Sequence, residues 1–184
     1  MLNYFFPFQR TVKELLNYNK LKYSLKKDNW NFSHSKINMI NKETKEWEKY
    51  YLPINIKNKI VLDVGAGEGE TARFFLQYGA KKVISIENNK QYLKNLLINA
   101  LNHPKIEVIY GSFLPFMINY EFDFMKCDIE GYEEILLDYT ELLKYSVIEV
   151  HGLQLATRFS YSGFRKIDTS QNNCNCTNIF YWKC

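Results

Sequence analysis

Residues 60–70 of this chain read Ile-Val-Leu-Asp-Val-Gly-Ala-Gly-Glu-Gly-Glu. The apolar run predicts a buried parallel strand, and the three glycines at alternate positions predict a tight turn into a helix. Glycine lets the backbone turn sharply and lets a ligand approach closely, while amides at the start of the helix point toward that ligand. In the dinucleotide pattern G-x-G-x-x-G, the third glycine would stand at Glu70. The acids Asp63 and Glu70 suit a ligand with a positive charge and an adenosine better than a pyrophosphate.

The composition indicates one domain with a hydrophobic core. The chain has 184 residues, of which 46% are hydrophobic, and its formal charge of +4 permits an anionic partner without requiring one. It has no run of about 18 apolar residues, so we expect no transmembrane helix, no membrane partner and a cytoplasmic location. The four cysteines are expected to be ordinary thiols, and a metal or disulfide role for Cys174, Cys176 and Cys184 is the alternative.

From Lys59 onward the sequence alternates strand and helix patterns. This alternation predicts an α/β fold with a mostly parallel sheet and helices on both faces. Two short apolar runs on either side of a polar loop, Phe164–Ile167 and Ile179–Trp182, predict a hairpin that adds an antiparallel strand at the sheet edge. The expected parallel strands are Ile60–Val64, Lys82–Ile86, Ile106–Tyr110, Phe122–Cys127 and Ser146–Val150, and the expected helices are Glu70–Tyr78, Asn89–Leu101 and Tyr132–Leu143.

Residues 1–52 contain no glycine and predict an N-terminal helical cap on a core of residues 53–184. The helices expected there are Thr11–Ser24 and Lys42–Tyr51, the second of which ends before Pro53. Such a cap either covers a ligand site or packs on the sheet, and the sequence leaves both open.

Polar residues stand at the ends of the second and third predicted strands. In open α/β sheets, ligands bind beyond the carboxyl ends of the strands. Glu87 ends the second strand, where a carboxylate can accept hydrogen bonds from both ribose hydroxyls of an adenosine. Asn88 follows it and is expected in the same site. After the third strand, Ser112 is expected at the edge of the adenine and Phe113 at its face.

The fourth predicted strand runs into a burst of charge. Lys126, Asp128 and Glu130 would share one face if the strand persisted that far. Buried charges are retained where they pair or work, so these residues either fix the turn as an ion pair or border the reacting groups. Asp128 and Glu130 could ligate a divalent ion, but two carboxylates without a third positioned ligand make a weak metal site. We therefore assign no metal ligand here, and whether a divalent metal assists stays open.

The fifth predicted strand brings Glu149 and His151 to the same edge. A histidine with a near-neutral pKa can take a proton from a hydroxyl nucleophile. A structural, hydrogen-bonded role for His151 is the alternative.

Four stretches together resemble the class I S-adenosylmethionine-dependent methyltransferases and, more narrowly, the FkbM-type family. They are the acid-glycine loop and residues 85–89, 125–133 and 148–151. The family signature is a K-I-D-x-E-G-x-E run, from which this chain departs mainly by Cys127 in place of the aliphatic residue. The resemblance covers roughly residues 59–152, and the N-terminal and C-terminal parts lie outside it.

The resemblance implies S-adenosylmethionine as the cofactor and a hydroxyl on a small molecule or sugar as the acceptor. Asp63 would hold the amino group of the methionine moiety and Glu87 the ribose, while the loop residues Gly65, Ala66, Gly67 and Gly69 would lie against the cofactor. Asp128, which also borders the cofactor, Glu130 or His151 would orient or deprotonate the acceptor. Lys126 would set their charge.

Three other functions stay open from the sequence. A nucleic-acid methyltransferase is favoured by the mild positive charge and by the Lys-rich N-terminal segment with its tyrosines and Trp30. An NAD-linked oxidoreductase is disfavoured by the glycine spacing and the acids. A non-catalytic domain that binds S-adenosylmethionine is the third. The sequence does not fix the acceptor or the oligomeric state.

Overall fold

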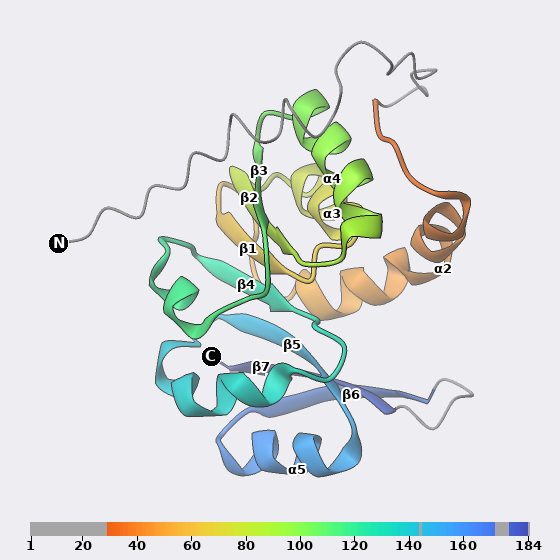
Figure 1. The fold of residues 1–184 in the computed structure, drawn as a ribbon. Helices are drawn as coiled ribbons and strands as arrows, with labels where there is room; N and C mark the ends of the chain where they lie inside the picture. The colour runs from red at the N-terminus through yellow and green to blue at the C-terminus, as the bar shows by residue number, and fades with distance from the viewer. Residues whose placement is uncertain (1–28, 144, 172–176, 184) are drawn as a thin grey trace, which may run out of the picture.

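The computed structural model describes residues 29–143, 145–171 and 177–183. Their strands form one mixed sheet in the order β3-β2-β1-β4-β5-β7-β6 (Figure 1). The first five strands in the chain are parallel, and β7 is antiparallel to both β5 and β6. The strands are β1 (Ile60–Val64), β2 (Lys82–Glu87), β3 (Ile106–Tyr110), β4 (Phe124–Cys127), β5 (Ser146–His151), β6 (Arg165–Gln171) and β7 (Thr177–Lys183).

Alternate residues of the central strands divide the core between the two faces of the sheet. Val61 and Val83 pack with α2 and α3, whereas Leu62 and Ile84 pack on the opposite side with η2 and α5. Both faces are therefore covered, as the sequence predicts and as Figure 1 shows. The helices are α2 (His34–Tyr51), α3 (Glu70–Gln77), α4 (Lys90–Asn102) and α5 (Leu153–Tyr161), and the 3₁₀ segments are η1 (Pro115–Asn119) and η2 (Glu133–Leu142).

The predicted parallel strands, α3 and α4 are confirmed to within two residues at each end. The segment expected as a helix at Tyr132–Leu143 forms the 3₁₀ segment η2 instead, and Tyr139, with a non-helical φ of −122°, interrupts it. The helix α5 is not predicted, although Ala156 and Phe159 at helical spacing form its buried side. The hairpin contributes two antiparallel strands, with β7 between β5 and β6.

In the described part of the N-terminal region, the helix is longer than the sequence predicts. The helix α2 begins at His34 instead of Lys42, and its aromatic residues Trp47, Tyr50 and Tyr51 lie in the same core cluster as Val61 and Val83. The predicted helix Thr11–Ser24 and the cysteines of the tail lie outside the described residues. The division of the chain at residue 52 stays a prediction. In the described part of the chain, no helix combines the length and the apolar character that crossing a bilayer requires.

The strand order reverses between β1 and β4, which places the expected ligand edge at the carboxyl ends of these two strands. The loop after β1 approaches the end of β4 so closely that a Cβ atom on Gly65 would lie 1.7 Å from the carbonyl oxygen of Asp128. Gly65 also has a φ of +73°, which L side chains rarely adopt. Glycine is therefore required at this position by both conformation and space.

We expect Gly65→Ala to lower the free energy of unfolding by about 3 kcal/mol or more, because left-handed strain of about 1–2 kcal/mol adds to overpacking against a backbone carbonyl. Gly163→Ala is the matched control, since Gly163 has a φ of +84° with nothing within 4 Å of its added Cβ. This control should lose only the strain, about 1–2 kcal/mol. Urea unfolding of both variants measures the difference, and equal losses would contradict the close approach.

Candidate functional site

A buried ion pair lies beneath the glycine loop. Asp63 in β1 and Lys126 in β4 are register partners, and the Lys126 Nζ atom lies 3.4 Å from the Asp63 Oδ1 atom. The same ammonium donates to the carbonyl oxygens of Gly65 at 2.7 Å and Val64 at 3.3 Å. The Thr71 hydroxyl donates to the other Asp63 oxygen at 2.7 Å. These bonds fasten the loop and the start of α3 to the middle of the sheet.

The position of Lys126 differs from the one expected for a residue that faces the reactants. The strand β4 ends at Cys127, so strand alternation does not carry Lys126, Asp128 and Glu130 onto one face. Only 3% of Lys126 is exposed. Burial by itself lowers the pKa of Lys126, but the charges of Asp63 and Asp128 outweigh it and raise that pKa. Lys126 is therefore a cation beneath the loop, and its ion-pair partner is Asp63 rather than the Asp128 or Glu130 that the sequence analysis considers.

The glycine loop folds over the end of β2. The amides of Gly65 and Ala66 both donate to the Ile86 carbonyl, at 3.0 and 3.1 Å, and the amide of Gly69 donates to the Ala66 carbonyl at 2.9 Å. Gly69 has a φ of +95° and precedes the first residue of α3. Backbone hydrogen bonds within the loop and to β2 thus fix its conformation.

Glu87 joins this loop to the start of α4. Its Oε2 atom accepts a hydrogen bond from the Gly67 amide at 2.8 Å, and its Oε1 atom accepts one from the Asn89 amide at 2.6 Å. A carboxylate has about four lone-pair positions, so two remain for further donors. The acid that the sequence assigns to a ribose therefore lies against the glycine loop, as a shared ligand site requires.

The residues expected around an adenine lie in two different environments. Asn88 and Ser112 are exposed, and the Asn88 side-chain amide donates to the Ser112 hydroxyl at 3.4 Å. Phe113 is only 6% exposed and belongs to the core cluster that includes Met117 of η1. The two polar residues thus meet beyond β2 and β3, while stacking of the Phe113 ring on a ligand stays a prediction.

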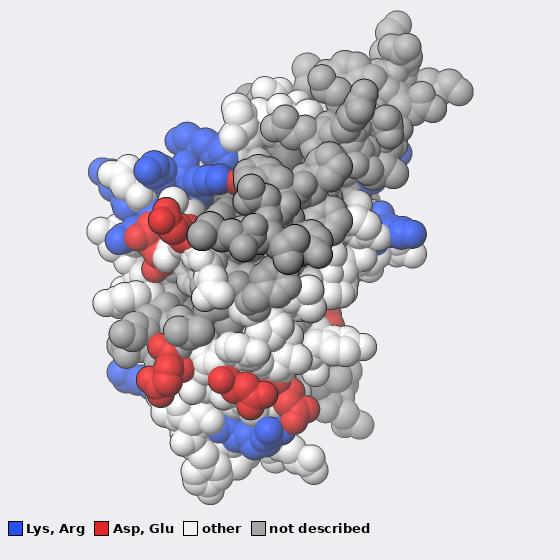
Figure 2. Space-filling view, turned by 60° about the vertical axis from the view of Figure 1, so that its left-hand side comes forward, with Lys and Arg blue, Asp and Glu red and all other residues white. Residues whose placement is uncertain are grey.

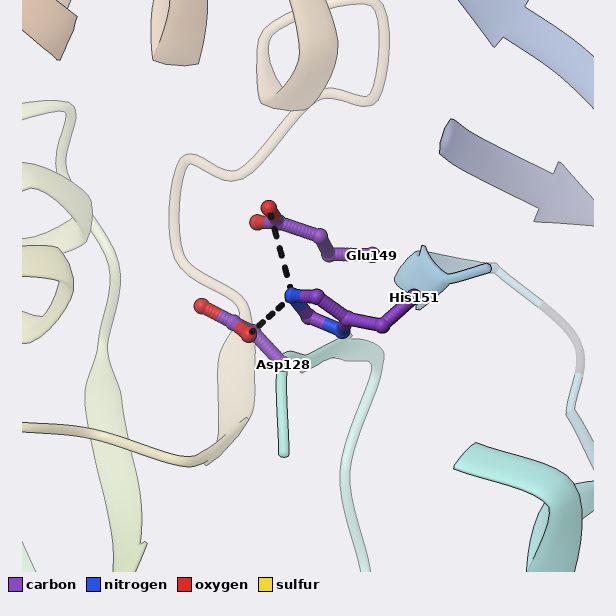
Figure 3. A group of neighbouring side chains, drawn as sticks. All are labelled: Asp128, Glu149 and His151. Atoms are coloured by element: carbon purple, nitrogen blue, oxygen red, sulfur yellow. Dashed lines mark ion pairs between the residues drawn. The ribbon is translucent and has the colours of Figure 1, made fainter. Parts of the chain in front are cut away.

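Carboxylates surround His151 at the end of β5 (Figure 3). The His151 Nε2 atom lies 3.9 Å from an oxygen of Asp128, 3.8 Å from one of Glu149 and 3.7 Å from one of Glu130. Its Nδ1 atom lies 3.0 Å from the Oε1 atom of Glu133. We call these five residues the acidic cluster. It brings together the predicted Asp128, Glu130 and His151 and adds Glu133 and Glu149.

Glu133 holds the acidic cluster in place from below. It is fully buried, and its Oε1 atom accepts hydrogen bonds from the amides of Ile129 at 3.2 Å and Gly131 at 3.0 Å. Glu133 is the last acid of the K-x-D-x-E-G-x-E run, but no role is predicted for it. Its hydrogen bonds depend on the 3₁₀ segment η2, which the sequence does not reveal.

The electrostatics of the acidic cluster follow from four carboxylates around one imidazole. Burial by itself lowers the pKa of His151, but the hydrogen bond and charge of Glu133, with the charges of Asp128 and Glu149, raise that pKa to about 9. Burial and the neighbouring Asp128 raise the pKa of Glu149 to about 8, against the charges of His151 and Lys126. The cluster therefore holds more negative charge than its imidazole can pair.

Residues 31–36, ahead of and at the start of α2, lie over the glycine loop. The Ser33 amide donates to the Glu68 carboxylate at 2.6 Å, and the Lys36 ammonium lies 2.6 Å from the Glu70 carboxylate. Asn31 is bound on the α4 side, where its amide donates to the Asn99 side chain at 2.6 Å. Both glutamates are at least 96% buried, so this segment covers the side of the loop that leads into α3.

Three residues of the acidic cluster have the donor atoms for a metal ion. Asp128, Glu149 and His151 each offer one atom, and these atoms all lie within 4.8 Å of one another. From the sequence, only Asp128 and Glu130 are candidate ligands, and a third positioned ligand is missing. Glu149 and His151, which lie on one face of β5, add a carboxylate and an imidazole to Asp128.

Three of the solved structures with a similar fold are methyltransferases. Fibrillarin from Aeropyrum pernix, with natively bound S-adenosyl-L-methionine, has a TM-score of 0.54 and 14% identity, covering 70% of this chain and 68% of that chain. Precorrin-6y C5,15-methyltransferase from Geobacter metallireducens has a TM-score of 0.57 and 13% identity, covering 89% and 95%. Ribosomal protein L11 methylase from Lactobacillus delbrueckii has a TM-score of 0.54 and 17% identity, covering 85% and 82%. The fold is therefore the Rossmann-like fold of class I methyltransferases, as predicted.

Curated relatives point to the same class. Histone-arginine methyltransferase CARMER from Drosophila virilis is 34% identical over 110 residues, which are 56% of this chain and 20% of that protein. CARMER from Aedes aegypti is 47% identical over 57 residues, which are 30% of this chain and 10% of that protein. The chain thus spans a fifth or less of the length of these relatives. No protein family model matches, so the FkbM-type resemblance stays a prediction.

We expect Lys126→Met to lower the free energy of unfolding by about 3–5 kcal/mol, because it leaves the buried Asp63 charge without a partner. Lys82→Met is the control, since Lys82 pairs with Glu107 on the exposed surface and should lose no more than about 1 kcal/mol. Adding Asp63→Asn to Lys126→Met should restore part of the loss. Chemical denaturation checks all three, and a small effect of Lys126→Met would show that the pair does not hold the loop.

Proposed function

We propose that this chain binds S-adenosylmethionine and transfers its methyl group to an acceptor oxygen. The observation that carries the proposal is the hydrogen bond between the Gly67 amide and Glu87, which unites the glycine loop after β1 with the acid after β2. This junction lies where the strand order reverses, the usual ligand position in open α/β sheets. The methyltransferase neighbours, one of them with S-adenosyl-L-methionine bound, support the cofactor.

Different residues of the chain are suited to different parts of this cofactor. The cofactor supplies a methyl group already activated by the sulfonium. Glu87 has unused lone pairs for ribose hydroxyls, and Asn88 with Ser112 offers exposed polar groups beyond it. Asp63 is bound to Lys126 and Thr71, which hold the loop, and its contact with the methionine amino group stays a prediction.

The acidic cluster forms the acceptor side of the proposed site. Asp128 follows β4, and its carbonyl oxygen lies against Gly65, so the cluster begins where the glycine loop ends. Asp128 or Glu130 takes the proton of the acceptor hydroxyl as the oxygen forms its bond to the methyl carbon. His151, whose pKa is raised to about 9, is protonated near neutral pH and orients the hydroxyl, in place of the near-neutral base that the sequence predicts. The electron pair of the broken carbon–sulfur bond stays on sulfur. A small molecule or sugar is the acceptor class that we propose.

A second candidate is methyl transfer to a nitrogen of a positively charged side chain, such as arginine, with loss of one proton from that side chain. The excess of carboxylates over cations in the acidic cluster favours a positively charged acceptor. The curated relatives are histone-arginine methyltransferases, which gives this candidate independent support. A nucleic-acid acceptor has less support, because on the face in Figure 2 the described residues form small separate groups of acids and bases without a continuous basic surface.

We expect Glu87→Ala to weaken the binding of S-adenosylmethionine roughly ten- to hundredfold, because charge-assisted hydrogen bonds to the ribose are lost. Isothermal titration calorimetry measures the affinity, and circular dichroism verifies the fold. Glu107→Ala, an exposed acid on β3, is the matched control and should bind as the native chain does. Glu87→Gln, which keeps one acceptor oxygen, should lie in between. Unchanged affinity of Glu87→Ala would remove the ribose assignment.

Methyl-labelled S-adenosylmethionine distinguishes the candidate acceptors. Incubation with a panel of sugars and small hydroxyl compounds should transfer label to oxygen, and Glu107→Gln should do so at the native rate. Label on arginine-containing peptides instead would favour the second candidate. Label on RNA, with binding that falls steeply with salt, would favour the nucleic-acid alternative. Binding of the cofactor without transfer to any of these acceptors would favour a non-catalytic domain.

A further inference from the structure

The side chains of Asp128, Glu149 and His151 converge from two neighbouring strands (Figure 3). Asp128 follows β4, whereas Glu149 and His151 lie two residues apart on β5 and so share one face of that strand. All three side chains are partly buried. Their donor atoms lie within 4.8 Å of one another, which is the span of ligands around a single ion.

The orientation of His151 suits a metal ligand. Its Nδ1 atom faces the fully buried Glu133, which also accepts three backbone hydrogen bonds and cannot turn away without losing them. A divalent ion that displaces the Nε2 proton would leave the other proton on Nδ1, and the Nε2 lone pair would then face Asp128 and Glu149. A carboxylate behind the distal nitrogen is the usual support of a metal-binding histidine, because it fixes both the tautomer and the ring orientation.

A second observation concerns the carboxylate of Asp128. Its Oδ1 atom is buried and has no hydrogen-bond partner among the described residues. The nearest cationic atom, His151 Nε2, lies 3.9 Å away, which is too long for a hydrogen bond. A buried carboxylate oxygen without a partner is costly, and a cation shared with Glu149 and His151 would satisfy it.

We propose that Asp128, Glu149 and His151 bind one divalent ion of a first-row transition metal. One imidazole and two carboxylates match manganese and its neighbours better than calcium, which prefers oxygen ligands alone. Three protein ligands in a partly exposed place leave coordination positions for water or substrate. Glu130 is 86% exposed and lies at the rim of the site.

The role of this ion rests on the function proposed above, whereas its binding does not. A hydroxyl that coordinates a divalent ion ionises more easily, which suits an acceptor oxygen beside the cofactor. The hydroxyl proton would leave to Glu130 or to water. The oxygen would then bond to the methyl carbon while the carbon–sulfur electron pair stays on sulfur, so that no oxidant or reductant is needed.

Binding is tested with manganese alone on the full chain after removal of metals with EDTA. Electron paramagnetic resonance and calorimetry should give one site per chain in the absence of S-adenosylmethionine. Asp128→Asn, Glu149→Gln and His151→Gln should each weaken the site at least tenfold, while the control Glu107→Gln leaves it unchanged. Absence of a stoichiometric site, or equal effects in the control and the three variants, would overturn the proposal.

Glu133→Gln tests the positioning role of the residue behind His151. It should weaken manganese binding roughly ten- to hundredfold, because the tautomer and orientation of the imidazole are no longer fixed. Thermal unfolding of the same variant shows whether the chain is folded. A folded Glu133→Gln chain with native manganese affinity would contradict this role. If this variant does not fold, the three ligand variants decide the metal site alone.

The two proposals fail in distinguishable ways. Methyl transfer to a hydroxyl acceptor at the same rate with EDTA and with manganese would overturn the role of the ion and leave the proposed function intact. A manganese site in a chain that does not bind S-adenosylmethionine would overturn the proposed function and leave the metal site intact.

Discussion

The buried pair of Lys126 and Asp63 is the interaction on which the arrangement of the site depends. It joins β1 to β4 at the point where the strand order reverses, and the same ammonium binds the carbonyls of Val64 and Gly65. Removing two charges from water is costly, and the mutual attraction compensates only while both partners remain. The Lys126 ammonium therefore holds the loop that follows β1, and moving it away would leave the buried Asp63 charge without a partner.

Two further buried carboxylates also join separate segments of the chain near strand ends. Glu87 ties the glycine loop to the start of α4, and Glu133 ties the turn after β4 to His151. Each accepts hydrogen bonds from backbone amides, so neither can rotate freely toward a ligand. Groups held in this way need little rearrangement when charge develops during a reaction. The cofactor side and the acceptor side of the proposed site are thus built from fixed charges around one short loop.

The sequence predicts the sheet because strands and helices differ in hydrophobic period and because glycines mark the loop. It also predicts that Asp63, Glu87, Asp128 and His151 lie at or next to strand ends, since polar residues are conspicuous after apolar runs. It does not reveal that Lys126 faces Asp63, because this depends on where β4 ends and on its register with β1. The burial of Phe113 likewise depends on packing across the sheet. Glu149 enters the metal site only once β5 is placed beside the turn after β4.

The charge of the acidic cluster separates the candidate acceptors from one another. Asp128, Glu130 and Glu149 face a single imidazole nitrogen, so one additional cationic group can be accommodated beside them. A divalent ion and a cationic nitrogen would compete for the same carboxylates, and binding of one removes the attraction for the other. The proposed metal is therefore compatible with a hydroxyl acceptor. A hydroxyl is neutral and loses its proton only when the bound ion favours ionisation. A chain that binds no ion at this cluster would instead retain its full negative charge for a cationic acceptor.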